Sequence, residues 1–257
     1  DEIGSEKILN FYHQNTFEFS IKDAQREHYL VEYQYRVLPC AMPEEDWESY
    51  KAYSKEIVQL QHALEQEDDE KDRLRLQQRI EGRYRDRAKL LKKNDQKVQT
   101  LQTIFDEIPP SARVLIYGDD LNHLDELGKE LDRMGKYYFK YTGELDAQKE
   151  RPTILKEFRQ GIRKILLAVG CLDEGIDIPA CDVAVFISSS TSERQFIQRR
   201  GRVLRIAPGK TTAWIYDYLV YPILPASTSD EERRMALSMI DAQYRRINLM
   251  VDDAING

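Results

Sequence analysis

The stretch ILLAVGCLDEGIDIPACDVAVFI, residues 165–187, contains two short apolar runs separated by a polar segment with two glycines. Each run, 165–169 and 183–187, is continuous rather than alternating, as expected for a strand buried on both faces. Three similar runs lie at 114–117, 137–139 and 212–216, and helical patterns separate the runs at 121–134, 148–158 and 196–204. This alternation predicts an α/β fold, a parallel sheet with helices on both faces.

We assign the α/β region to residues 108–225. The segments around it differ from it in composition and in hydrophobic pattern. Tyrosines and branched residues alternate with polar ones over 29–38, so residues 1–43 are expected to form a link with one extended strand. Residues 44–107 contain one glycine and no proline, and 44–97 holds 14 acidic and 13 basic residues. That composition predicts a charged helical hairpin with its turn within 65–72. Residues 226–257 are expected to form a C-terminal helix.

Composition excludes several classes of protein. The 257 residues are 41% hydrophobic and 32% charged, and they contain no apolar run of 18 residues that could span a membrane. The odd set Cys40, Cys171 and Cys181 lacks metal-site spacing and indicates reduced thiols, so we expect a cytoplasmic protein. The histidines are scattered, which predicts surface residues and no metal site; they are His13, His28, His62 and His123.

Two segments could carry chemistry. The first, GCLDEGIDIP at 170–179, directly follows a predicted strand, where ligands bind in open parallel sheets. Its glycines allow close approach of a ligand, although an ordinary capped loop would have the same composition. Net charge is −7, so any contact with nucleic acid has to be local.

The second segment is QFIQRRGRVLR, residues 195–205. On a helix, Gln198, Arg202 and Arg205 fall on one side, while an apolar set faces the core: Phe196, Ile197, Val203 and Leu204. Four arginines within seven residues suit a phosphate-bearing partner, because each guanidinium binds phosphate oxygens in pairs. A solvated basic helix is the alternative, but Gly201 within the helix suggests close approach by a ligand or another chain.

The sequence GKT at 209–211 imitates the end of a phosphate-binding P-loop. The motif requires a glycine at position 204, where Leu204 stands, and the segment leads into a strand rather than a helix. We therefore expect no P-loop in these residues.

Taken together, residues 111–221 resemble the second RecA-like lobe of a superfamily 2 helicase. The run 114–117 resembles motif IV, Thr142-Gly143 and 158–161 resemble the segment that follows it, 166–179 resembles motif V, and 198–205 matches the motif VI pattern QRxGRxxR. Residues 19–31 are similar to the link between lobes in XPB-like repair helicases and restriction-enzyme motor subunits.

The resemblance implies an ATP-dependent DNA helicase or translocase. Arg202 and Arg205 would be the catalytic arginine fingers, and Gly175, Asp177 and Gln198 would lie near the nucleotide. ATP and Mg²⁺ would be held mainly by a first lobe preceding these residues, so this chain alone is expected to be inactive.

The resemblance also assigns contacts with nucleic acid to Thr142, Gly143, Val169 and Gly170. Val169 takes the place of the threonine that usually begins motif V, which leaves backbone N–H groups as the expected donors. DNA is the expected partner, with RNA still open, and the hairpin is either a solvated arm or one that touches nucleic acid or a partner protein. The alternative function is a degenerate RecA-like interaction module, but that module would not need both Arg202 and Arg205.

Overall fold

A parallel β-sheet forms the centre of the molecule. The computed structural model describes residues 19–145, 149–169, 181–188 and 193–257. Within them, six strands pair in the order β1-β6-β5-β2-β4-β3, and every pair is parallel. The strands are β1 (Glu32–Met42), β2 (Val114–Tyr117), β3 (Phe139–Tyr141), β4 (Ile165–Ala168), β5 (Val183–Val185) and β6 (Thr212–Pro222). The predicted α/β, RecA-like architecture is confirmed.

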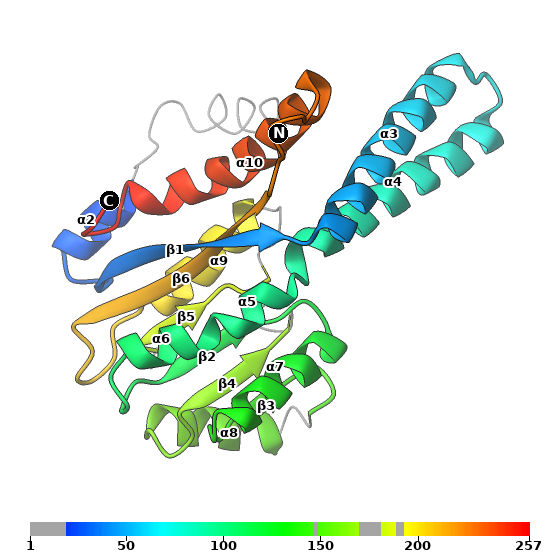
Figure 1. Cartoon of the computed structure of the whole chain (residues 1–257). Coiled ribbons are helices and arrows are strands. Elements are labelled where there is room, and N and C mark those ends of the chain that lie inside the picture. The colour runs from blue at the N-terminus through cyan, green and yellow to red at the C-terminus, as the bar shows by residue number, and fades with distance from the viewer. Residues whose placement is uncertain (1–18, 146–148, 170–180, 189–192) are drawn as a thin grey trace, which may run out of the picture.

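Helices cover both faces of the sheet (Figure 1). Alternate residues of a strand point to opposite faces, so Leu115 and Tyr117 belong to one apolar cluster while Val114 and Ile116 belong to the other. The first cluster is completed by α8 (Glu150–Arg159) and α9 (Glu193–Val203), and the second by α6 (Leu101–Glu107) and α7 (Leu121–Arg133). The last helix, α10 (Asp230–Val251), runs alongside β1 and β6 and contributes to both clusters.

The strand expected in the N-terminal link is part of the sheet. All eleven residues of β1 pair with β6, which makes β1 an edge strand. Its outer edge is covered by the side-chain amide of Asn256, which accepts from Tyr35 N at 2.9 Å and donates to Tyr35 O at 3.0 Å. These bonds satisfy backbone groups that an open edge would leave unpaired. The alternating pattern revealed the strand, but its partner lies about 180 residues away along the chain.

One predicted strand is displaced. The run 137–139 was expected to be extended, whereas β3 spans Phe139–Tyr141. Gly135 adopts a left-handed conformation, φ 64°, at the end of α7, and Tyr137 beyond it is 90% exposed. The apolar run therefore begins in the turn that leaves the helix, and only its last residue enters the sheet.

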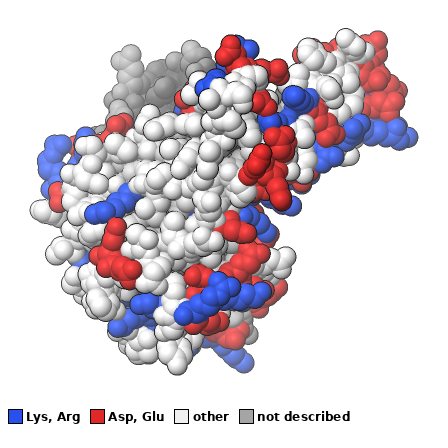
Figure 2. All heavy atoms as spheres, in the orientation of Figure 1, with Lys and Arg blue, Asp and Glu red and all other residues white. Residues whose placement is uncertain are grey.

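The charged hairpin forms as predicted and projects from the lobe (Figure 1). Helices α3 (Glu44–Gln66) and α4 (Glu70–Lys92) flank a turn at 67–69, and the Asp69 carboxylate caps α4 by accepting from Lys71 N and Asp72 N. Acidic side chains gather at its tip, and charges of both signs lie along it (Figure 2). Residues 95–107 leave the hairpin and return to the sheet as α5 (Asp95–Gln99) and α6. A short α2 (Ile21–Arg26) precedes β1.

Candidate functional site

Part of the predicted site gathers at the carboxyl edge of the sheet. The last residues of β3 and β4, Tyr141 and Ala168, are paired, so the residues that follow them, Thr142 and Val169, lie side by side. Thr142 is only 6% exposed, whereas Gly143 is exposed. Of these neighbours, the backbone of Gly143 is therefore the most open to a ligand. The predicted residues Gly170, Gly175 and Asp177 lie outside the described residues.

An arginine that sequence analysis missed supports this edge. Arg151, on α8, donates from Nη2 to the carbonyl oxygen of Gly143 at 2.7 Å, and its guanidinium lies 6.0 Å from the centre of the Tyr141 ring. The buried Nε of Arg151 has no hydrogen-bond acceptor among the described residues. Sequence spacing gives no signal for this contact, because it depends on how α8 packs back against β3.

The motif VI segment forms α9, and its packing differs in part from expectation. Phe196, Val203 and Leu204 are fully buried, and the Phe196 ring meets the edge of Phe186 at a centroid distance of 5.0 Å. Ile197, which was expected in the core, is 41% exposed. The helix ends at Val203, so Arg205 lies beyond it and the helical angle used to place Arg205 was wrong.

The four arginines of this segment divide into two pairs. Arg199 and Arg200 are each only 5% exposed. The Arg199 guanidinium lies 4.8 Å from the centre of the Tyr117 ring and donates to Ser188 O at 3.3 Å. Arg200 forms an ion pair with Asp253 at 3.0 Å. These two arginines join α9 to the sheet and to the C-terminal segment, which corrects the expectation that all four meet an anion.

The other pair is accessible. Arg202 is half-buried and Arg205 is exposed, and Gln198 is exposed one helical turn before Arg202. A Cβ atom added at Gly201 would meet nothing within 4 Å. The close approach inferred from this glycine is thus not made by any described residue.

A buried lysine holds the backbone beneath Arg205. Lys210 donates from Nζ to the carbonyl oxygens of Val203 and Arg205, the latter at 3.2 Å. It is 7% exposed, and burial lowers the pKa of its ammonium group. The sequence pattern assigned this residue no role beyond the false P-loop. In the structure it ties the end of α9 to the segment that leads into β6.

Arg205 lies at the amino edge of the sheet, opposite the Thr142–Val169 edge. It forms an isolated antiparallel bridge with Leu30, and Val31 N donates to Leu204 O at 2.8 Å, just before β1 begins. Because every pair in the sheet is parallel, the starts of β1 and β6 are remote from the ends of β3 and β4. Arg205 and Thr142 thus lie on opposite edges of the sheet.

The expectation that all four histidines lie on the surface was wrong for His123. This residue is 1% exposed, and its Nδ1 accepts from Asp119 N at 3.2 Å. Burial, reinforced by the nearby Lys97 and Lys93 ammonium groups, lowers the pKa of His123 to about 4. The ring is therefore neutral at pH 7. Cys40 and Cys181 are buried and form no disulfide, while Cys171 lies outside the described residues.

Arg202 and Arg205 are suited to an anion rather than to a metal ion. Guanidinium groups donate to phosphate oxygens, and these two are the accessible cations of the motif. Among the residues that the structure describes, no group of three histidine, cysteine or acidic side chains is placed to bind a metal. The donor set of Arg202 and Arg205 therefore fits a nucleotide phosphate. No helix in the described part of the chain is long and apolar enough to cross a membrane.

Comparison with known proteins relates part of this chain to helicase domains. Residues 96–207 match the family described as helicase conserved C-terminal domain. The chain is 41% identical over 56 residues to DNA 3'-5' translocase XPB2 of Sulfurisphaera tokodaii, covering 22% of this chain and 13% of that protein. It is 26% identical over 161 residues to the putative ATP-dependent RNA helicase MJ1505 of Methanocaldococcus jannaschii, covering 58% of this chain and 19% of that protein. The chain thus matches less than a fifth of the length of these relatives.

The fold agrees with a solved structure, the C-terminal part of the Fun30 ATPase domain. The TM-score is 0.54 at 12% identity, and the match covers 84% of this chain and 99% of the other. At that identity the likeness shows the fold alone. Residues 96–207 thus match the helicase conserved C-terminal domain family, and the chain shares the α/β fold of the C-terminal part of the Fun30 ATPase domain.

Proposed function

We propose that this chain is the C-terminal motor lobe of an ATP-driven DNA helicase or translocase. In this proposal Arg202 and Arg205 are arginine fingers that reach ATP bound on a separate first lobe. The observation that carries it is a difference in exposure: Arg199 and Arg200 are each 5% exposed, whereas Arg202 is half-buried and Arg205 is exposed.

The chemistry asked of these residues is electrostatic. Negative charge on the γ-phosphate oxygens is redistributed as the phosphoryl group is transferred, and donors already in place stabilise it without reorganisation. The Lys210 bonds to the carbonyls of Val203 and Arg205 hold the backbone that presents the second finger. Gln198, exposed on the same face as Arg202, would orient a finger or contact the nucleotide, as would Gly175 and Asp177. Mg²⁺ would be bound with ATP on the first lobe.

The carboxyl edge at Thr142 and Val169 would hold the nucleic acid. Gly143 is exposed beside Val169 at the ends of β3 and β4, and Arg151 fixes the Gly143 carbonyl. Contacts from backbone N–H groups at Gly143 and Gly170 would position a phosphate backbone without reading bases, which suits a motor that moves over any sequence.

DNA is proposed as the track because of the XPB2 likeness, in which 41% of 56 residues are identical. The name of the archaeal RNA helicase relative points to the other polynucleotide. Parallel assays with DNA and RNA of one sequence would separate the two, since stimulation of ATP hydrolysis by RNA alone would overturn the choice of DNA.

The test of the proposed function compares two proteins. One is this 257-residue chain, and the other is the same chain preceded by its first lobe. We expect no ATP turnover by the chain alone, with or without nucleic acid, and turnover stimulated by nucleic acid in the two-lobe protein. Robust hydrolysis by the chain alone would contradict the proposal. A two-lobe protein that folds and binds ATP but does not hydrolyse it would instead support the degenerate interaction module.

A further inference from the structure

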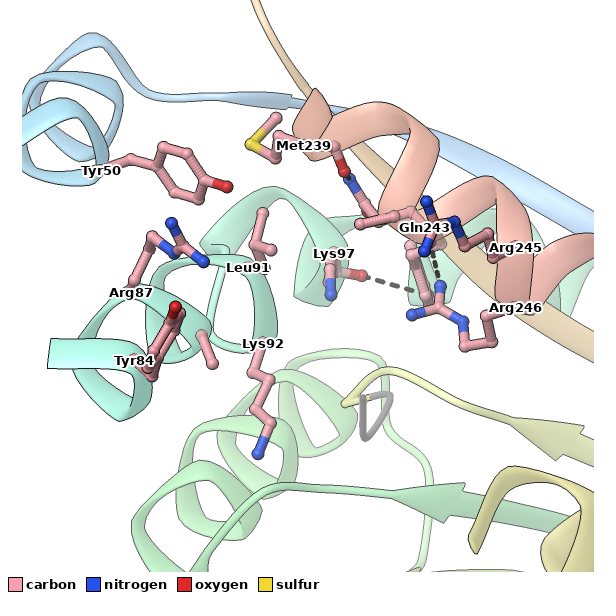
Figure 3. Close-up of a pocket in the computed structure, with 13 residues that line it drawn as sticks. Tyr50, Tyr84, Arg87, Leu91, Lys92, Lys97, Met239, Gln243, Arg245 and Arg246 are labelled. Atoms are coloured by element: carbon pink, nitrogen blue, oxygen red, sulfur yellow. Dashed lines mark hydrogen bonds between the residues drawn. The ribbon is translucent and has the colours of Figure 1, made fainter. Parts of the chain in front are cut away.

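A cavity lies at the root of the hairpin, apart from the residues assigned to ATP and the nucleic-acid track. It has a volume of about 520 Å³ and opens between α3 and α4 on one side and α10 on the other. Tyr50, Tyr84 and Arg87 come from the hairpin, Arg245 and Arg246 face them from α10, and α5 contributes Lys97 between the two sides (Figure 3). The volume falls in the range of small-ligand sites, about 300–1,000 Å³.

The charge of this lining is one-sided. Among the described residues, five basic side chains line the cavity and no acidic one does; the five are Arg87, Lys92, Lys97, Arg245 and Arg246. The whole chain has net charge −7, so this concentration of positive charge opposes the average of the molecule. Like charges gathered in one concave site repel one another, and an anion bound there would relieve that repulsion.

Two of the five cations are already neutralised. Lys92 pairs with Asp119 at 2.8 Å, and Arg246 pairs through Nε with Asp217 at 3.0 Å. No carboxylate among the described residues lies within 4.0 Å of Arg87, Lys97 or Arg245, and this distance is the usual limit of an ion pair. The lining therefore carries three positive charges without a paired acid.

Lys97 is the most constrained of these cations. It is only 4% exposed, and its Nζ donates to the carbonyl oxygen of Ile187 at 3.0 Å. The ammonium group carries three donors, and one neutral carbonyl compensates only part of what burial removes. Burial lowers the pKa of Lys97 to about 8, despite the opposing attraction of Asp217. A negatively charged ligand in the cavity would supply the missing counter-charge.

The guanidinium groups are held in place before any ligand arrives. Arg87 lies between two rings, 5.2 Å from the centre of Tyr50 and 5.1 Å from that of Tyr84, and donates to Ser54 Oγ at 3.2 Å. Arg246 is fixed through Nε and Nη2, which leaves its Nη1 without a hydrogen-bond acceptor in the described part of the chain. Preorganised donors of this kind reduce the entropic cost of binding.

We propose that this cavity is a binding site for a phosphate-bearing ligand, either a free nucleotide or pyrophosphate or the phosphates of a nucleic-acid strand. Guanidinium forks match phosphate oxygens, and Lys97 provides a point charge at the base of the site. The apolar part of the lining, Leu91 and Met239 among others, would meet the sugar or base. The proposal is independent of the arginine fingers and does not require ATP hydrolysis.

The test titrates the 257-residue chain with pyrophosphate, with ATP and with a labelled single-stranded oligonucleotide, using calorimetry for the first two and fluorescence anisotropy for the third. The diagnostic variant is Arg245→Glu, because Arg245 is exposed and makes no hydrogen bond or ion pair with the described residues. The matched control is Arg234→Glu, which makes the same charge change at an exposed position of the same helix, outside the cavity.

We expect saturable binding of at least one probe, weakened about tenfold or more by Arg245→Glu and little changed by Arg234→Glu. A tenfold loss corresponds to one charge-assisted hydrogen bond. The probe that shows this pattern identifies the source of the phosphate. Three results would overturn the proposal: no saturable binding of any probe, equal losses in the two variants, or a loss caused by the double variant Arg202→Ala/Arg205→Ala but not by Arg245→Glu.

Discussion

His123 shows how a single buried side chain makes stability depend on pH. Its pKa is about 4 in the folded protein and about 6.5 when exposed, because burial and nearby lysines disfavour the charged ring. Above pH 6.5 the ring is neutral in both states and there is no penalty. As the pH falls from 6.5 towards 4, the unfolded chain binds a proton that the folded protein does not, so stability is lost.

We predict that His123 removes up to about 3 kcal/mol of unfolding free energy over this pH range, from a pKa difference of about 2.5 units. Urea denaturation at pH 7 and pH 4.5 would measure the loss. In His123→Asn, whose amide oxygen can still accept from Asp119 N, the loss should shrink, whereas His62→Gln on the exposed hairpin should leave it unchanged. An equal pH dependence in the wild type and His123→Asn would contradict this account.

The sequence pattern indicated which segment carries the arginines but not what each arginine contacts. The periodicity of 195–205 placed Arg202 correctly on the accessible side. It could not reveal that Arg199 meets Tyr117 and Arg200 meets Asp253, because those partners come from β2 and the C-terminal segment. The role of Lys210 could not be predicted for the same reason, because its hydrogen bonds depend on how the segment before β6 packs beside the end of α9.

A further prediction concerns helix α9 and the glycine within it, Gly201. No atom of the described residues lies within 4 Å of a Cβ atom built at Gly201, and glycine in a helix costs about 1 kcal/mol relative to alanine. Gly201→Ala should therefore stabilise the 257-residue chain by up to about 1 kcal/mol, measured by thermal or chemical denaturation. In the two-lobe protein, the same methyl group should lower ATPase activity, because it occupies the surface expected to face the first lobe.

Either half of this prediction can fail separately. A destabilised chain would show that the surface around Gly201 is not open. A stabilised chain with unchanged activity in the two-lobe protein would show that the glycine face does not approach another lobe or a ligand.

Sequence patterns predicted the helices and strands better than the pairing between them. The continuous apolar runs at 114–117 and 165–169 contain β2 and β4. The charged segment 44–107 contains the hairpin, whose turn at 67–69 lies inside the expected range of 65–72. Pairing between distant segments cannot be read from local sequence patterns. The sequence therefore predicted β1 as a strand in a link and not as the edge strand beside β6. The division of the chain into four segments therefore remains a prediction, although β1 belongs to the central sheet and α10 packs against it.

The whole molecule is acidic, and this limits how it can bind nucleic acid. Net charge is −7, and charges of both signs are interspersed over the face in Figure 2. The neutralisation of phosphates dominates binding that is independent of sequence. We therefore predict weak binding of the 257-residue chain to oligonucleotides, with an affinity that falls steeply with salt and does not change with base sequence.

Fluorescence anisotropy across a salt series, with single- and double-stranded oligonucleotides of several sequences, would measure this affinity. Tight binding that persists at high salt, or that follows one sequence, would contradict the motor-lobe proposal and favour a recognition module.

The central claim is that Arg202 and Arg205 act on the phosphates of ATP held by another lobe. Its most direct test is the steady-state ATPase kinetics of the two-lobe protein with saturating nucleic acid, comparing Arg202→Ala and Arg205→Ala with the wild type and with Arg234→Ala as a control. We predict that each finger variant lowers kcat by about 10³-fold or more with little change in ATP affinity, the size of effect known for arginine fingers. An increase in KM with kcat unchanged would contradict the claim, because it would make these arginines binding groups rather than groups that stabilise the transition state.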